Sequence, residues 1–217
     1  MVEREYRKRT PPVAGVSHAV RFMHPGALKV IIGAGQQRWE GWVATQRDEL
    51  DLADADSWAR FFGERRADAL LCEHVLEHLT PEDAKRAARN AFAYLKPGGF
   101  IRVAVPDRHF PDEAYQKIVR VGGPGPADHP AADHKVVFGY RELAEIFAQA
   151  GFSVDLLEYH DEEGRFHGNE WEPEDAPVFR SSKLDPRNRG GTMAFPSIII
   201  DAIRPGVDLV SRNQHEP

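Results

Sequence analysis

The stretch richest in reactive side chains is EHVLEH, residues 73–78, which holds two histidines and two glutamates. His74, Glu77 and His78 follow the H-x-x-E-H order of one class of zinc peptidase, in which two imidazoles one helical turn apart bind the metal and the carboxylate acts as base. The same letters also suit a buried strand that runs out into a cofactor pocket. The elements around the stretch decide between these two interpretations.

A zinc site of the H-x-x-E-H kind needs both histidines on one continuous helix, because only there does an i, i+4 spacing aim both at one ion. The preceding residues 68–73, DALLCE, form an apolar run typical of a buried strand. A new helix is predicted after Thr80, a good N-cap, because Pro81 suits the first helical position. At most one helical turn fits between them, and no third ligand stands out, so we expect no metal site.

The rest of the chain alternates predicted strands with predicted helices. Apolar runs predict strands at residues 30–32, 42–45, 68–73, 100–105, 153–159 and 194–203, and periodic apolar positions predict helices at 57–62, 81–95 and 140–150. Such alternation indicates an α/β protein with a doubly wound, mostly parallel sheet covered on both sides. Ligands are then expected at the carboxyl ends of the strands.

Composition is that of one ordinary globular domain. The chain has 217 residues, of which 41% are hydrophobic and 29% charged. Its net charge of −6 gives no overall field that favours nucleic acid, and no window is long and apolar enough for a membrane span. The one cysteine, Cys72, lies in an apolar run and fits a reducing compartment, so we expect a cytoplasmic protein. We divide the chain into an arm at 1–26, a domain at 27–205 and a tail at 206–217.

The glycines after the first strand permit a tight turn and a close backbone approach to a ligand. They are Gly33 and Gly35, in the stretch LKVIIGAG. A dinucleotide-binding fingerprint would need a third glycine three residues after Gly35 and then a helix. Arg38 stands at that position, and only residues 36–40 precede Gly41, so the turn disfavours NAD.

Six stretches, in this order, resemble the class I S-adenosylmethionine-dependent methyltransferases, and most of all a compact bacterial group of mainly predicted members. They are LKVIIGAG, GWVATQ, LDLAD, DALLCEHVLEHLTPEDA, YLKPGGFIRVAVPD and LAEIFAQAGF. The resemblance covers about residues 27–160, and its most specific part is 68–107. It implies a Rossmann-like sheet of the seven-stranded type with an antiparallel final strand, and S-adenosyl-L-methionine as cofactor.

The resemblance also implies which residues bind that cofactor. They would come from the glycine turn, the end of the second strand, an Asp-Leu pair that meets adenine, and the end of the central strand. The residues are Gly33, Ala34, Gly35, Gln46, Asp51, Leu52, Glu73 and His74. Three positions depart from the family pattern, which more often has a polar residue, a third glycine and a ribose-binding carboxylate at Ile31, Gln37 and Gln46. These departures motivate an alternative, a methyltransferase-fold protein that has lost catalysis and serves as a binding or assembly module.

The acceptor side is expected in two loops. The loop 106–139 leaves the strand edge nearest the expected methyl group, and its histidines could deprotonate a hydroxyl, with His134 favoured over His109. The insertion 160–193 is long enough to suggest a cover over the acceptor, with Trp171 as a flat contact and Arg180 or Arg187 as anion ligands; a segment packed on the sheet or at a subunit contact is the alternative. We expect a small-molecule or saccharide-like acceptor methylated at oxygen, and the sequence allows a homo-oligomer.

Overall fold

The computed structural model describes residues 26–188 and 193–206 and contains one seven-stranded sheet in the order β2-β1-β3-β4-β7-β5-β6. Its strands are β1 (Lys29–Ile32), β2 (Val43–Ala44), β3 (Ala67–Glu73), β4 (Leu95–Pro106), β5 (Ser153–His160), β6 (Phe166–Gly168) and β7 (Ser197–Ile203). The helices are α3 (Ala55–Phe62), α4 (Pro81–Tyr94), α5 (Glu113–Val119) and α6 (Tyr140–Gln149), with 3₁₀ turns η1 (Leu76–His78) and η2 (Pro186–Asn188). The predicted arm 1–26 and tail 206–217 lie almost wholly outside the described residues.

Strand directions confirm the predicted sheet. Strands β2, β1, β3 and β4 run parallel to one another, and β7 is antiparallel to both of its neighbours, β4 and β5. All seven residues of β3 are buried, as the continuous apolar run DALLCE predicts for a central strand. The carboxyl ends of β1 and β3 therefore meet at one edge of the sheet.

Local signals place α3 and α4 where the sequence predicts them. Helix α4 begins after Thr80, whose hydroxyl accepts from the backbone N–H of Asp83, and Pro81 occupies its first turn. Helix α3 begins after Asp54, whose carboxylate accepts from the N–H of Asp56. No helix in the described part of the chain is long and apolar enough to cross a membrane.

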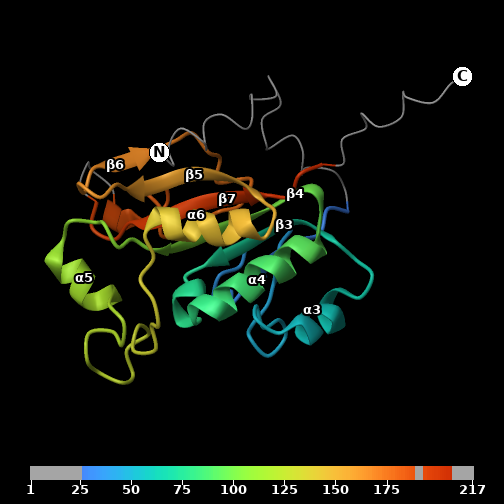
Figure 1. Ribbon diagram of the computed structural model, residues 1–217, viewed down its shortest axis with the longest axis horizontal. Helices are drawn as coiled ribbons and strands as arrows, with labels where there is room; N and C mark the ends of the chain where they lie inside the picture. The colour runs from blue at the N-terminus through green and yellow to red at the C-terminus, as the bar shows by residue number, and fades with distance from the viewer. Residues whose placement is uncertain (1–25, 189–192, 207–217) are drawn as a thin grey trace, which may run out of the picture.

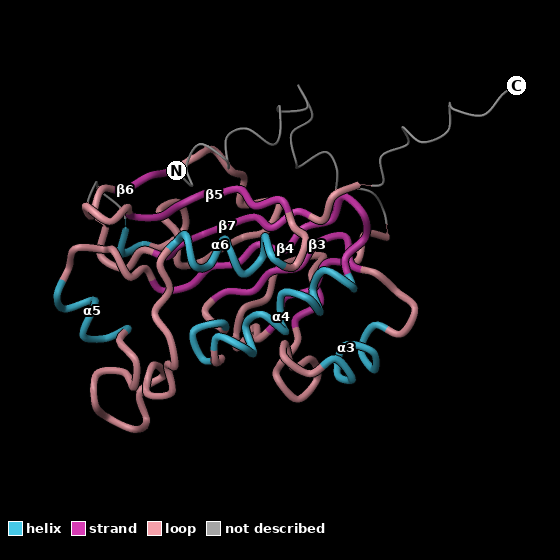
Figure 2. Tube along the Cα trace, viewed as in Figure 1, coloured by secondary structure: helices cyan, strands magenta, loops and turns pink. Residues whose placement is uncertain are grey.

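The two faces of the sheet are covered differently. Helices α3, α4 and α6 lie side by side against one face (Figure 1, Figure 2) and bury residues such as Trp58, Ala88 and Leu143 against Leu70 and Val103. Within the described ranges, the other face is covered by an irregular segment, residues 169–188, which we call the covering segment. Both faces are covered, as predicted, but only one of them by helices.

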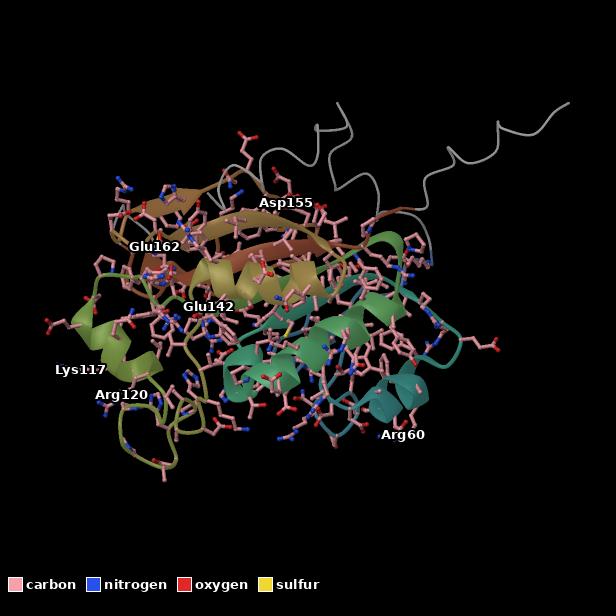
Figure 3. The ribbon with its side chains drawn as sticks, viewed as in Figure 1. Arg60, Lys117, Arg120, Glu142, Asp155 and Glu162 are labelled. Carbon is pink, nitrogen blue, oxygen red and sulfur yellow. The ribbon has the colours of Figure 1, made fainter. Side chains whose placement is uncertain are left out.

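Apolar side chains of the covering segment complete the second core. Trp171, Ala176 and Val178 pack on Leu71 and Ile199 of the sheet. Figure 3 shows side chains filling the space between the helices and the sheet, whereas the charged side chains that it labels are solvent-exposed: Arg60, Lys117, Arg120, Glu142, Asp155 and Glu162. Apolar side chains thus form a core on both sides of the sheet.

Three features differ from the sequence predictions. Strand β4 begins at Leu95 rather than at Phe100, because Leu95 pairs with Ala67 of β3, and a register shift between Ala67 and Ala69 accommodates the stretch with Gly98 and Gly99. Gly99 fits there because a Cβ would lie 2.8 Å from the carbonyl oxygen of Asp68. Helix α5 and strand β6 were not predicted.

Candidate functional site

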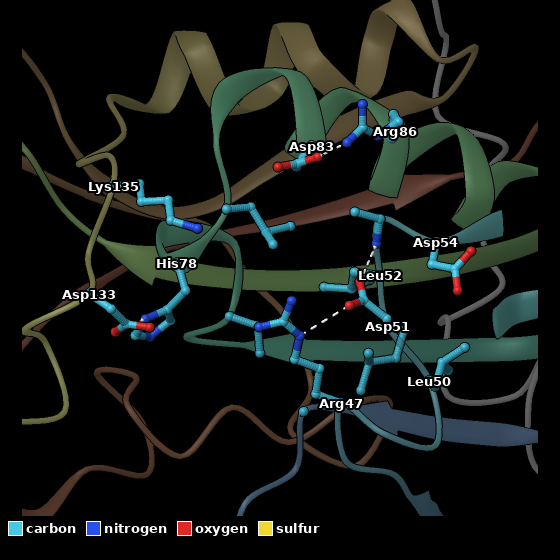
Figure 4. Close-up of a pocket in the computed structure, with 15 residues that line it drawn as sticks. Arg47, Leu50, Asp51, Leu52, Asp54, His78, Asp83, Arg86, Asp133 and Lys135 are labelled. Carbon is cyan, nitrogen blue, oxygen red and sulfur yellow. Dashed lines mark hydrogen bonds and ion pairs between the residues drawn. The ribbon is translucent and has the colours of Figure 1, made fainter. Parts of the chain in front are cut away.

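A cavity of about 350 Å³ opens at the carboxyl ends of β1 and β3. Its walls come from Ile32 and Gly33, from residues within 47–54 and 75–86, and from Asp133 and Lys135 of the loop after α5. Figure 4 shows His78, Asp133 and Lys135 on one side of the cavity, with Asp51 and Leu52 on the other. The cavity thus lies at the strand edge where parallel α/β sheets bind ligands, and its volume is in the lower part of the range for small-molecule sites.

The glycine turn after β1 is fixed by close packing and by backbone pairing. Gly33 and Gly35 have φ values of 64° and 53°, which favour glycine. A Cβ on Gly33 would lie 2.7 Å from a methyl carbon of Val75, so this glycine is required by the chain that leaves β3; a Cβ on Gly35 would meet nothing within 4 Å. Ala34 donates its N–H to the carbonyl of Thr45 and packs in the core of the second face. Of the three predicted turn residues, Gly33 lines the cavity.

Gln46 holds the glycine turn to the end of β2. Its side-chain amide donates to the carbonyl oxygen of Gly35 at 2.9 Å, and its backbone N–H donates to Glu49 at 2.8 Å. Gln46 is not among the residues that line the cavity. Its amide is therefore engaged in stabilising the turn.

Asp51 and Leu52, the predicted adenine contacts, both line the cavity beside Gly33. The Asp51 carboxylate accepts from the N–H of Ala53 at 2.9 Å and from Arg47 Nε at 3.0 Å. Because the Arg47 side chain is 87% exposed, a ligand amine can replace it at the carboxylate at little cost. The structure thus brings together the glycine turn and the Asp-Leu pair.

Glu73 points to the opposite side of the strand end and secures the covering segment. Its carboxylate accepts from the backbone N–H groups of Phe179 and Arg180, at 2.9 and 2.8 Å, and from the amide of Gln37 at 2.8 Å. Glu73 is 6% exposed and does not line the cavity. Sequence reasoning gave no sign of the contacts with Phe179 and Arg180, because these residues lie more than 100 positions away in the covering segment.

His74 adopts a positive φ of 55° at the end of β3 and turns away from His78. Its Nε2 lies 2.9 Å from the hydroxyl of Ser197, and its Nδ1 lies 3.1 Å from a carboxylate oxygen of Glu77. Only the single turn η1 follows, as predicted. The two histidines of the motif therefore do not share a helix, and the peptidase arrangement is absent from the described residues.

Glu77 is fully buried beneath the cavity, with an exposed fraction of 0%. Burial by itself would raise the pKa of its carboxyl, but the charge of His74, whose Nδ1 lies 3.1 Å from Oε1, and the charge of His78 outweigh burial and hold this pKa below its usual value. The group is therefore a carboxylate at neutral pH.

The two predicted catalytic histidines have different surroundings. His134 is 7% exposed and packs edge-on against the ring of His78, with centroids 4.9 Å apart, so it stands directly behind a cavity-lining side chain. His109 lies beside Gly139 and Tyr140 at the start of α6 and does not line the cavity. The structure joins His134, and not His109, to the EHVLEH stretch.

The sequence analysis missed the part that His78, Asp133 and Lys135 play in the cavity wall. His78 Nδ1 lies 2.6 Å from a carboxylate oxygen of Asp133, 55 residues along the chain. The backbone N–H of Lys135 donates to the carbonyl of Glu77 at 2.8 Å and so fixes the loop there. Neither contact has a local sequence signal.

The predicted acceptor contacts of the covering segment are largely engaged in the fold. Trp171 is 5% exposed in the core of the second face, so the sequence-based hypothesis of a flat acceptor contact is wrong for this conformation. Arg187 is paired with Asp185 at 2.6 Å, and Arg180 lies 3.9 Å from Glu73. The alternative, a segment packed on the sheet, describes the structure.

Comparisons with known proteins bear on the family and the fold. A family model described as a methyltransferase domain matches residues 7–157. Among solved structures, a chain of the complex between the Trm112 methyltransferase activator and a methyltransferase from Haloferax volcanii is 14% identical over 87% of each chain, with a TM-score of 0.50. A SAM-dependent methyltransferase from Archaeoglobus fulgidus is 15% identical over 93% of this chain and 91% of that one, with a TM-score of 0.47. No curated protein matches the chain.

The sheet order, the glycine turn and the cavity define a class I methyltransferase fold. The chain belongs to the methyltransferase domain family whose model it matches. It is an enzyme of the S-adenosylmethionine-dependent methyltransferase class, with S-adenosylmethionine as its cofactor. The cavity fits this group, because Gly33, the carboxylate of Asp51 and the apolar wall of Leu52 converge on it.

Proposed function

We propose that the protein transfers a methyl group from S-adenosylmethionine to a hydroxyl oxygen of a small-molecule or saccharide-like acceptor. The observation that carries this proposal is one cavity with Gly33 and Asp51 on one side and His78, backed by His134, on the other. The cavity walls carry charges of both signs, from Arg47, Arg86 and Lys135 and from Asp51, Asp83 and Asp133, which suits a polar acceptor.

In this proposal Asp51 accepts from the exocyclic amine of adenine, and Leu52 and Val75 cover the ring. The exposed Arg47 gives up its contact with Asp51 on binding. Gly33 and Gly35 offer backbone groups to the other end of the cofactor. The cofactor supplies a methyl group already activated as a sulfonium, so the chain has only to position the acceptor and remove its proton.

His134 is the proposed base. Its Nδ1 lies 2.8 Å from the carbonyl oxygen of Val119, which can only accept, so Nδ1 carries a proton and the lone pair is on Nε2. An imidazole fixed in this tautomer can take a hydroxyl proton at Nε2 and remain held at Nδ1. His109 is the weaker alternative, because its ring lies at the start of α6.

Calorimetric titration with S-adenosylmethionine and with its demethylated product tests the part of the proposal that concerns cofactor binding. Asp51→Ala should weaken binding by about 1–3 kcal/mol, because a buried amine loses its acceptor. Asp56→Ala, which removes an exposed carboxylate in the first turn of α3, is the matched control and should leave affinity unchanged. Absence of heat with the wild type at high micromolar ligand would favour the catalytically silent module.

The base is tested by the release of demethylated cofactor over a panel of hydroxylated small molecules and sugars. With an acceptor in hand, His134→Ala should lower turnover about a hundredfold or more while cofactor affinity is retained. His129→Ala, in the same loop, is the control. Wild-type turnover of His134→Ala would reject the assignment, and methylation of amine acceptors alone would reject the choice of oxygen.

A further inference from the structure

Three side chains next to the cavity form a cluster of metal-binding type. One ring nitrogen each of His78 and His134 and one carboxylate oxygen of Glu77 lie within 4.8 Å of one another. Glu77 and His78 belong to η1, whereas His134 comes from the loop after α5. The fold thus joins the last two residues of the EHVLEH stretch to a residue more than 50 positions away.

Hydrogen bonds fix both imidazoles in the form that a metal ion requires. Nδ1 of His134 donates to the carbonyl of Val119 at 2.8 Å, and Nδ1 of His78 lies 2.6 Å from the carboxylate of Asp133. Both acceptors leave Nε2 as the nitrogen with a lone pair. Histidines that bind metal ions characteristically donate their other ring N–H to a carboxylate or a backbone carbonyl in this way.

The state of the Glu77 carboxylate is a second observation that points to a bound cation. It is 0% exposed, and neither of its oxygens makes a hydrogen bond in the described structure. The nearest ionisable group is His74, whose Nδ1 lies 3.1 Å from Oε1. A buried carboxylate without hydrogen bonds is costly, and a bound cation is a standard way to compensate it.

The backbone also holds the three groups in place. The carbonyl of Glu77 accepts from the N–H of Lys135 at 2.8 Å, and the carbonyl of His134 accepts from the N–H of Gly122 at 2.9 Å. The histidine loop is therefore tied to η1 and to the end of α5. Only small side-chain shifts would bring the ligand atoms to bonding distance.

We propose that Glu77, His78 and His134 bind a divalent transition-metal ion, such as Zn²⁺ or Fe²⁺. Two imidazoles and one carboxylate suit these ions, whereas Mg²⁺ and Ca²⁺ prefer oxygen ligands alone. Three protein ligands leave coordination positions open, and His78 lines the cavity, so an open position faces the acceptor side. This site differs from the H-x-x-E-H peptidase motif, because His134 takes the place of His74.

The consequence for catalysis, unlike metal binding itself, rests on the proposed function. An ion at this site takes the Nε2 lone pair of His134, so this imidazole acts as base only in the metal-free protein. With the ion bound, the ion itself would lower the pKa of an acceptor hydroxyl that reaches it. The acceptor would then be a hydroxyl with a second oxygen nearby that can also reach the ion, as in a vicinal diol or a hydroxy acid.

The test uses the full-length chain after metal removal. Titration with Co²⁺, followed by visible absorption, and with Zn²⁺, followed by calorimetry, should each give about one equivalent bound. His78→Ala and His134→Gln should abolish this binding, and Asp133→Asn should weaken it about 10- to 100-fold, as expected for an outer partner. His129→Ala, which changes a histidine of the same loop outside the cluster, should bind as the wild type does.

Thermal unfolding shows whether a variant that fails to bind the ion is still folded. Zn²⁺ should raise the melting temperature of the wild type and of His129→Ala but not that of His134→Gln. No binding of either ion by a folded wild type, or equal binding by the wild type and both ligand variants, would overturn the proposal. Calorimetry with S-adenosylmethionine on the same samples separates it from the proposed function, because cofactor binding without metal binding would reject the metal site alone.

Discussion

The two faces of the sheet are covered by two different physical means. On the helical face, α3, α4 and α6 bury apolar side chains, and each helix satisfies its own backbone groups. On the other face the covering segment, residues 169–188, has no regular structure apart from η2. Its backbone N–H and C=O groups must therefore find partners elsewhere.

Buried charged side chains of the sheet supply those partners. Arg102 donates to the carbonyls of Glu172 and Ala176, and Glu73 accepts from two N–H groups near Phe179. Glu158 accepts from the indole of Trp171 and from the N–H and hydroxyl of Ser182. The comparison shows that an irregular cover can close an α/β sheet when the strands themselves carry hydrogen-bonding groups. It also predicts that replacing a polar or charged side chain should cost much stability on this face and little on the helical face.

The largest effect is expected at Asp201, which makes a bidentate ion pair with Arg102 at 2.7 and 2.8 Å. Arg102 is 1% exposed and also packs on the ring of Trp171, 4.7 Å from its centroid. Asp201→Ala leaves the guanidinium buried without a counter-charge and should lower the free energy of unfolding by about 3–5 kcal/mol. Urea denaturation measures this loss.

The matched control is an exposed ion pair on the helical side. Arg60 lies 3.4 Å from Asp54, and the two side chains are 69% and 48% exposed. Arg60→Ala should cost no more than about 1 kcal/mol. Equal losses for Arg60→Ala and Asp201→Ala would mean that the buried polar contacts do not support the second face.

A smaller effect is expected at Glu73. Glu73→Gln keeps the size of the side chain but replaces one acceptor oxygen by a donor that faces the N–H groups of Phe179 and Arg180. The loss should be about 1–3 kcal/mol, together with faster proteolysis within the covering segment. Urea denaturation and limited proteolysis would measure these, with the exposed Glu174→Gln as control.

Glu73→Gln also tests whether Glu73 secures the covering segment or contacts the cofactor. The structure engages its carboxylate in the covering segment and leaves it outside the cavity, so cofactor affinity should be unchanged in Glu73→Gln. A large loss of affinity with wild-type stability would instead support the cofactor contact that the family resemblance implies.

The contrast between the faces also explains how much the sequence could predict. Strands β1 and β3 and helices α4 and α6 were predicted because apolar runs, the Thr80 cap and Gly151 are local signals. The short helix α5 was missed, although Asp112 caps it and Tyr115 and Val119 are buried one turn apart. Seven residues carry too little periodicity to stand out in a loop rich in glycine and proline.

The site was predictable to the same degree as the elements that hold it. Gly33 follows from the glycine turn after β1, and Asp51 follows from the family resemblance; both line the cavity. The approach of His134 to Glu77 depends on a backbone contact of Lys135, and the partners of Glu73 depend on how the covering segment folds. Long-range contacts of this kind leave no periodicity in the sequence.

The smallest effect is expected at Thr80, where the helical face has a local polar contact. Its hydroxyl accepts from the N–H of Asp83 at 3.2 Å and donates to the Asp83 carboxylate at 2.7 Å. Thr80→Ala removes the cap and should lower the free energy of unfolding by about 1 kcal/mol, whereas Thr80→Ser keeps the hydroxyl and should cost less. Urea denaturation of both variants measures the difference.

The pH dependence of the unfolding free energy gives a further test of the Thr80 prediction. The hydrogen bond from Thr80, and then the charge of Arg86, hold the pKa of Asp83 below its usual value. A carboxyl whose pKa is lowered on folding contributes stability above its unfolded pKa, near 4 for an ordinary aspartate, and loses it as the pH falls through the folded value. The gap between Thr80→Ala and the wild type should therefore narrow below about pH 4. A difference in unfolding free energy between Thr80→Ala and the wild type that stays constant down to pH 2 would contradict the role of the Asp83 carboxylate. A loss as large as that of Asp201→Ala would show that the two faces do not differ in the way their contacts suggest.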